Sequence, residues 1–124
     1  MSELKSLNDT KPIDLHSALE RIGGDESLLH ELIEIYIEDF LEKHDLLKQA
    51  IEHGDFNTIK EIGHSLKGSS GNLSLTNLHE TFYQIEMSGR EEDIERARYF
   101  FHVLNKEFQK LRDFFPKQKT QFSG

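Results

Sequence analysis

The segment from Gly63 to Leu73, Gly-His-Ser-Leu-Lys-Gly-Ser-Ser-Gly-Asn-Leu, holds the residues whose types and spacing could do chemistry. At about 100° per helical residue, His64 lies roughly 140° from the apolar face, so we expect its imidazole to face water. Lys67 follows one turn later, and Gly68 and Gly71 add no side chain. Each glycine costs a helix about 1 kcal/mol relative to alanine, which is typical of a functional segment. Such a surface would give a second protein access to a nucleophilic histidine.

Two lysines flank this histidine at helical spacing, Lys60 four residues before it and Lys67 three residues after it. Like charges disfavour the imidazolium, so they favour a neutral, nucleophilic ring. They would also attract a phosphoryl group on the ring nitrogen, each by about 1 kcal/mol at an exposed site. An alternative is that the helix ends at Gly68 and that Gly-Ser-Ser-Gly-Asn forms a loop. The spacing alone leaves both interpretations open.

Other chemistry finds less support in the sequence. Glu61 and His64 have the Glu-x-x-His form of di-iron bundles, but no second copy exists and both residues point outward on the predicted helix. No phosphate-binding loop, His-Glu-x-x-His motif or nucleophile elbow is present. We therefore expect no metal, no cofactor and no catalytic machinery of an enzyme. We expect the remaining histidines to be ordinary surface or flanking residues: His16, His30, His44, His53, His79 and His102.

Composition limits the classes of partner. A chain of 124 residues, 35% hydrophobic, is the size of one domain with one core. Its net charge of −8 argues against nucleic acid, because a phosphate binder needs a basic face. The absence of cysteine excludes disulfides and fits a reducing compartment. No apolar run approaches the roughly 20 residues of a membrane span, and no signal peptide is recognisable, so we expect a soluble cytoplasmic protein.

Helical periodicity is confined between Pro12 and Pro116, with no alternating pattern of strand type. Residues 1–12 and 117–124 are predicted to be flexible tails, and 13–116 to be one domain. A short helix fits 13–22 and stops at Gly23-Gly24. Four longer helices are predicted: one capped by Asp25 and ending near 53, one from 56 to about 70, one from about 76 to 87 and ended by Ser88-Gly89, and one opening with Glu91-Glu92-Asp93.

Each long segment has an apolar seam at spacings of three and four residues. The last seam is the most regular, and its members are Ile94, Ala97, Phe101, Leu104, Phe108, Leu111 and Phe115. Four amphipathic helices joined by short turns predict an all-α, antiparallel, up-and-down four-helix bundle, with the short N-terminal helix as a lid.

The chain resembles the histidine-containing phosphotransfer (HPt) domains of multistep phosphorelays over nearly all of residues 13–100. The segment from His64 to Gly71 matches their His-x-x-Lys-Gly-x-x-Gly signature. The resemblance implies that His64 accepts the phosphoryl group, that Lys67 stabilises it and that Gly68 leaves room for the partner. It also places Glu86 beside the histidine, where its carboxylate would accept the Nδ1 hydrogen and leave Nε2 free to attack. The alternative for Glu86 is an ordinary surface glutamate.

One departure from the family pattern is Ser74, where a glycine is usual. The resemblance further implies a monomer that relays a phosphoryl group between His64 and the aspartate of response-regulator receiver domains. These domains would dock over Lys60, Gly68 and Gly71, and a sensor or hybrid histidine kinase would be a further partner. The alternative function is a non-phosphorylated helical scaffold or protein-interaction bundle, which has no need of a Lys-Gly pair after an exposed histidine.

Overall fold

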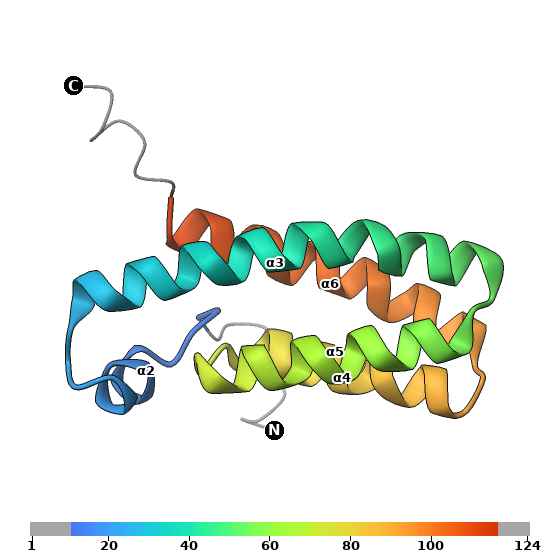
Figure 1. Ribbon diagram of the computed structural model, residues 1–124, viewed down its shortest axis with the longest axis horizontal. Coiled ribbons are helices and arrows are strands. Elements are labelled where there is room, and N and C mark those ends of the chain that lie inside the picture. The colour runs from blue at the N-terminus through green and yellow to red at the C-terminus, as the bar shows by residue number, and fades with distance from the viewer. Residues whose placement is uncertain (1–10, 117–124) are drawn as a thin grey trace.

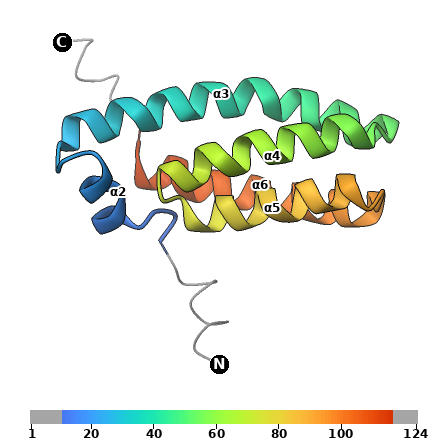
Figure 2. The same cartoon turned by 60° about the horizontal axis from the view of Figure 1, so that its bottom comes forward.

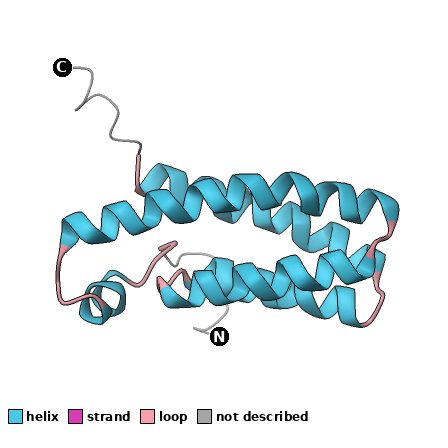
Figure 3. Cartoon of the chain, viewed as in Figure 1, coloured by secondary structure: helices cyan, strands magenta, loops and turns pink. Residues whose placement is uncertain are grey.

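A computed structural model describes residues 11–116, and within that range the chain forms five helices and no strand (Figures 1 and 3). The all-α fold predicted from the sequence is confirmed. The predicted tails lie outside the described residues, apart from Lys11 and Pro12. The helices are α2 (Leu15–Arg21), α3 (Glu26–His53), α4 (Phe56–Asn72), α5 (Thr76–Arg90) and α6 (Ile94–Phe114).

The four long helices run antiparallel to their neighbours in the chain, and two views show them as one elongated bundle (Figures 1 and 2). The short helix α2 lies at one end, beside the start of α3 and the turn between α4 and α5. The predicted up-and-down bundle with an additional N-terminal helix is therefore confirmed. None of the helices between residues 11 and 116 is long and apolar enough to cross a membrane.

Aspartate begins four of the helices, because its carboxylate can accept a backbone N–H that has no partner within the first turn. The aspartates and the N–H groups that they bind are Asp14 with Ser17, Asp25 with Leu28, Asp55 with Thr58, and Asp93 with Arg96. Gly54 ends α3 in the left-handed conformation, at φ 67°. The prediction that Asp25 caps this helix, and that the helix ends near residue 53, is thus confirmed.

The helix with the histidine motif, α4, continues to Asn72 through Gly68 and Gly71. The alternative of a loop after Gly68 is therefore wrong. Its buried face, with Ile59 and Leu66, packs into a core to which all the helices contribute. A polar link joins this face to α3, where the Tyr36 hydroxyl and Ser70 Oγ lie 2.7 Å apart in the core.

Two predicted boundaries of α5 and α6 are wrong. The helix α5 continues through Ser88 and Gly89 to Arg90. A Cβ at Gly89 would lie 2.6 Å from the backbone nitrogen of Lys60, so this glycine allows α4 to approach closely and does not end the helix. The helix α6 begins only at Ile94, after the Asp93 cap, because Glu92 adopts a positive φ of 54° and belongs to the turn.

Candidate functional site

His64 projects from the outer face of α4, and 69% of its side chain is exposed. The neighbouring Ile62, Gly63 and Leu66 are buried, so α4 turns its apolar face to the core and its histidine to solvent. The outward orientation predicted from the helical angle is thus what the structure shows. An exposed imidazole on a regular helix can meet a group carried by another protein.

Glu86 comes from the neighbouring helix α5 and is almost fully buried, with 4% of its side chain exposed. The alternative of an ordinary surface glutamate is therefore wrong. Its Oε2 lies 3.1 Å from His64 Nδ1. An ionised carboxylate can only accept a hydrogen bond, so Nδ1 is the protonated nitrogen. In the neutral ring, Nε2 then has the free lone pair, as a nucleophile requires.

Two cations accompany this carboxylate. Lys67 Nζ forms an ion pair with Oε1 at 2.8 Å, and Arg90 Nη2 donates to Oε2 at 2.9 Å. Burial alone would raise the pKa of Glu86. The contacts with Lys67, Arg90 and His64 outweigh burial and lower that pKa from 4.5 to about 2. The carboxylate is therefore ionised at neutral pH, and it contacts both the imidazole and Lys67.

Gly63 is the reason that Glu86 reaches the histidine. A Cβ at Gly63 would lie 2.6 Å from the Glu86 backbone nitrogen, so only glycine lets the two helices come this close. This role of Gly63 was not predicted from the sequence. The signal was available, because Gly63 lies roughly 40° from Ile59 at 100° per residue, on the apolar face of the helix. Arg90 was also missed, although it stands one helical turn after Glu86.

The three residues expected at the docking surface differ in their surroundings. Gly68 is exposed, and a Cβ there would meet nothing within 4 Å. Lys60 is half-buried, one turn before the histidine. Gly71 is also half-buried, and a Cβ there would lie 3.1 Å from Nδ1 of the His79 ring. The expectation of bare surface holds for Gly68 and is wrong for Gly71, whose missing side chain makes room for His79.

The turn after α4 retains its left-handed geometry in spite of the serine at position 74. Ser74 has a φ of 58° and is buried. Its hydroxyl donates to Ser17 Oγ of α2 at 3.1 Å, and its carbonyl accepts the Asp14 N–H at 3.0 Å. These bonds from the start of α2 hold the residue in a conformation that an L-residue enters at a cost.

In the part of the chain that the structure describes, no group of three or more His, Asp or Glu residues could hold a metal ion. Glu61 instead accepts a hydrogen bond from Asn57 on its own helix at 3.3 Å. The site around His64 therefore consists of one imidazole, one buried carboxylate and two cations.

Comparisons with known proteins identify the family. The family model of the Hpt domain matches residues 31–114. Histidine-containing phosphotransfer protein B (HptB) from Pseudomonas aeruginosa PAO1 has a similar structure, with a TM-score of 0.80 and 22% identity over 90% of this chain and 97% of that one. The histidine-containing phosphotransfer protein ZmHP2 from maize is also similar in structure, with a TM-score of 0.73 and 20% identity over 92% of this chain and 90% of that one. No curated protein sequence matches significantly. The family model covers more than half of the chain, and the chain therefore belongs to the Hpt domain family.

Proposed function

We propose that this Hpt domain carries its phosphoryl group on His64 and exchanges it with the aspartate of response-regulator receiver domains. Histidine phosphotransfer in a phosphorelay is the function that goes with the family. The observation that carries the assignment to His64 is its exposed ring with Nδ1 3.1 Å from the buried carboxylate of Glu86. Of the histidines between residues 11 and 116, it alone pairs with a carboxylate within 4 Å.

In the proposed reaction, the Nε2 lone pair of His64 attacks phosphorus in line with the bond to the receiver's aspartate. The N–P bond forms as the P–O bond breaks, and the aspartate leaves as a carboxylate. The imidazole becomes positively charged, and Glu86 stabilises this charge through the Nδ1 hydrogen. The reverse step returns the phosphoryl group to an aspartate. The receiver brings its own Mg²⁺, which supplies most of the charge stabilisation on the phosphoryl oxygens.

Lys67 is proposed to stabilise the phosphoryl group on Nε2. It is held at Glu86 Oε1, beside the ring, and its ammonium can turn towards the phosphoryl oxygens because a quarter of the side chain is exposed. Arg90 remains at Oε2 and continues to balance the charge of the carboxylate. A single cation at a partly exposed site contributes modestly, so Lys67→Ala is expected to slow transfer and shorten the lifetime of the phosphohistidine without abolishing acceptance.

The receiver is proposed to dock over Gly68 and Lys60, beside the histidine. Gly71 contributes indirectly, by making room for His79. Gly68→Gln is expected to leave the fold intact, because nothing lies within 4 Å of the position, and to reduce the rate of transfer with a receiver. Gly68→Ala is the matched control that adds little bulk. Unimpaired transfer in Gly68→Gln would contradict this docking surface.

A sensor or hybrid histidine kinase is the proposed source of the phosphoryl group, and the protein is proposed to act as a monomeric carrier with no enzyme activity of its own. A net charge of −8 makes nucleic acid an unfavourable partner. A cytoplasmic location is proposed because a chain without cysteine suits a reducing compartment.

The test of the acceptor compares His64→Gln with His102→Gln, which changes an exposed histidine on α6. Each protein is incubated with a phosphorylated receiver domain and assayed for acid-labile label. We expect label in the wild type and in His102→Gln and none in His64→Gln, with melting temperatures nearly equal. Retained label in His64→Gln would move the acceptor to another residue. Absence of label from every protein, with several receivers, would favour the scaffold alternative.

A further inference from the structure

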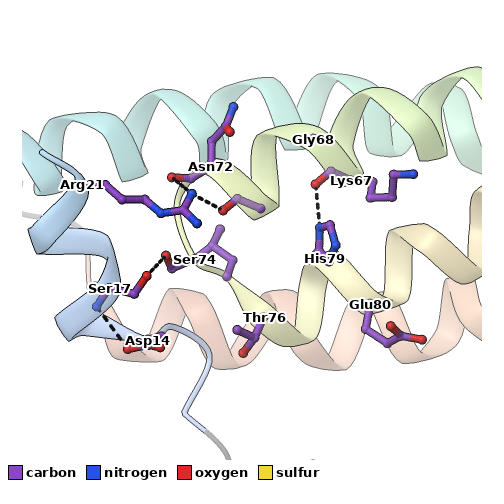
Figure 4. Close-up of a pocket in the computed structure, with 12 residues that line it drawn as sticks. Asp14, Ser17, Arg21, Lys67, Gly68, Asn72, Ser74, Thr76, His79 and Glu80 are labelled. Atoms are coloured by element: carbon purple, nitrogen blue, oxygen red, sulfur yellow. Dashed lines mark hydrogen bonds between the residues drawn. The ribbon is translucent and has the colours of Figure 1, made fainter.

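A groove of about 580 Å³ opens next to Gly68, between α2, the last turns of α4 and the first turns of α5 (Figure 4). Lys67 and Gly68 form one side of it, so the groove is continuous with the surface proposed for receiver docking. His79, on α5, reaches across towards α4, with its ring next to the Lys67 backbone. A partner that docks over Gly68 can therefore also contact His79.

Contacts with α4 fix the state of the His79 ring. Its Nδ1 lies 3.0 Å from the backbone carbonyl oxygen of Lys67, and a carbonyl can only accept, so Nδ1 is the protonated nitrogen. The ring occupies the space that a side chain at Gly71 would fill. In the neutral ring, Nε2 has a lone pair and no proton. The exposed edge of His79 thus offers a hydrogen-bond acceptor next to Gly68.

Hydrogen-bonding groups around the groove favour an occupant that donates. The two cations in its lining have partners in this chain: Arg21 Nη1 donates to the carbonyl oxygen of Gly71 at 3.0 Å, and Lys67 pairs with Glu86 at 2.8 Å. Two carboxylates, Asp14 and Glu80, also line the groove. Asp14 accepts the Ser17 N–H with one carboxylate oxygen, and Glu80 accepts the Gln84 amide with one. No residue between 11 and 116 donates to the second oxygen of either carboxylate.

We propose that His79 is a recognition residue for the receiver, and that its Nε2 accepts a hydrogen bond from a lysine or arginine side chain that enters this groove. The inference rests on the proposed function and adds the chemistry of the contact. Besides His79 Nε2, the carboxylates of Asp14 and Glu80 line the same groove, on a chain whose net charge is −8. Such complementarity sets the choice of partner more than it sets the chemical step.

Two substitutions separate recognition from a purely structural role. In His79→Asn, the amide nitrogen takes the place of Nδ1 and can still donate to the Lys67 carbonyl, but the Nε2 acceptor is lost. In His79→Gln, the amide reaches the place of Nε2, and the bond to Lys67 is lost. The control pair is His102→Asn and His102→Gln, because no residue of α6 lines the groove.

The measurement is phosphotransfer from a phosphorylated receiver, chosen from a panel as the fastest donor to this protein. We expect His79→Asn to raise KM for the receiver about fivefold with kcat nearly unchanged, and His79→Gln to raise KM less than about twofold. The His102 variants are expected to match the wild type. Double-mutant cycles between His79→Asn and alanine substitutions of the receiver's basic residues then identify the side chain that enters the groove.

The reverse order, with His79→Gln impaired and His79→Asn normal, would overturn the inference and assign His79 to positioning Lys67. Unchanged KM in both variants would remove His79 from the docking surface. Labelling with phosphoramidate, a small donor that needs no docking, keeps the proposed function separate. Wild-type and His79 proteins are expected to be labelled equally on His64. Absence of label from His64 would overturn the proposed function, and this inference with it.

Discussion

Gly63 and Glu86 face each other across α4 and α5 so closely that a Cβ at Gly63 would lie 2.6 Å from the Glu86 nitrogen and 2.8 Å from its Cα. The residue after Gly63 is His64, and Oε2 of the Glu86 side chain lies 3.1 Å from Nδ1 of its imidazole. Close packing of two backbones is thus what brings a buried carboxylate to an exposed histidine.

Replacing this glycine is expected to destabilise the bundle. The atoms that meet the new Cβ of Gly63→Ala are backbone atoms, so the helices must move apart, at a cost of about 1–3 kcal/mol. That cost exceeds the roughly 1 kcal/mol that alanine gains over glycine in helix propensity. Urea denaturation measures the difference. The control, Gly68→Ala, is open and is expected to stabilise the fold by up to about 1 kcal/mol. Equal stability of the two variants would contradict the close contact.

Protonation of Glu86 is expected to cost stability at acidic pH. Its pKa is about 2 in the folded protein against 4.5 for the free side chain, so the unfolded state binds the proton first as pH falls. The stability from the ionised group is complete above the unfolded pKa and is lost as pH falls towards the folded pKa. Between pH 5 and pH 2, the difference in unfolding free energy between wild type and Glu86→Gln should shrink by on the order of 3 kcal/mol. A difference independent of pH would refute this.

Arg90 is expected to help keep Glu86 ionised. Arg90→Gln removes a cation 2.9 Å from Oε2, so the pKa of Glu86 should rise, as followed by carbon-13 NMR titration of the carboxyl group. Lys67→Met should raise it as well, since Lys67 is the larger stabilising partner. Arg98→Gln breaks an exposed ion pair with Glu95 on α6 and serves as the control. The same Glu86 titration curve in Arg90→Gln and Arg98→Gln would contradict this role of Arg90.

The left-handed backbone conformation of Ser74 is expected to lower the stability of the fold. Ser74→Gly and Ser74→Ala both lose the hydrogen bond to Ser17, but only alanine keeps the cost of a positive φ. The glycine variant should therefore be more stable than the alanine variant by about 1 kcal/mol in thermal or urea unfolding. Ser17→Ala removes only the hydroxyl that accepts this hydrogen bond, so its stability measures the contribution of the bond. Equal stability of the two Ser74 variants would show that the turn relaxes to another conformation.

The sequence by itself determined the features that depend on neighbours in the chain. Helical periodicity predicted four long helices, Asp25 marked where the first of them begins, and the angle of His64 relative to the apolar seam placed its side chain outside. Each of these depends on residues within about one helical turn, so local pattern is enough to predict them.

Only the tertiary structure decided which residues of different helices meet. The burial of Glu86, the close contacts at Gly63 and Gly89, and the His79 ring over Gly71 depend on how α5 is set against α4. The sequence does not distinguish a glycine that ends a helix from one that leaves the surface bare or one that allows a neighbouring backbone to approach. The predicted roles of Gly89 as a helix end and of Gly71 as bare surface were wrong for this reason. Those contacts form between atoms that are distant in the chain, so the local sequence pattern cannot predict them.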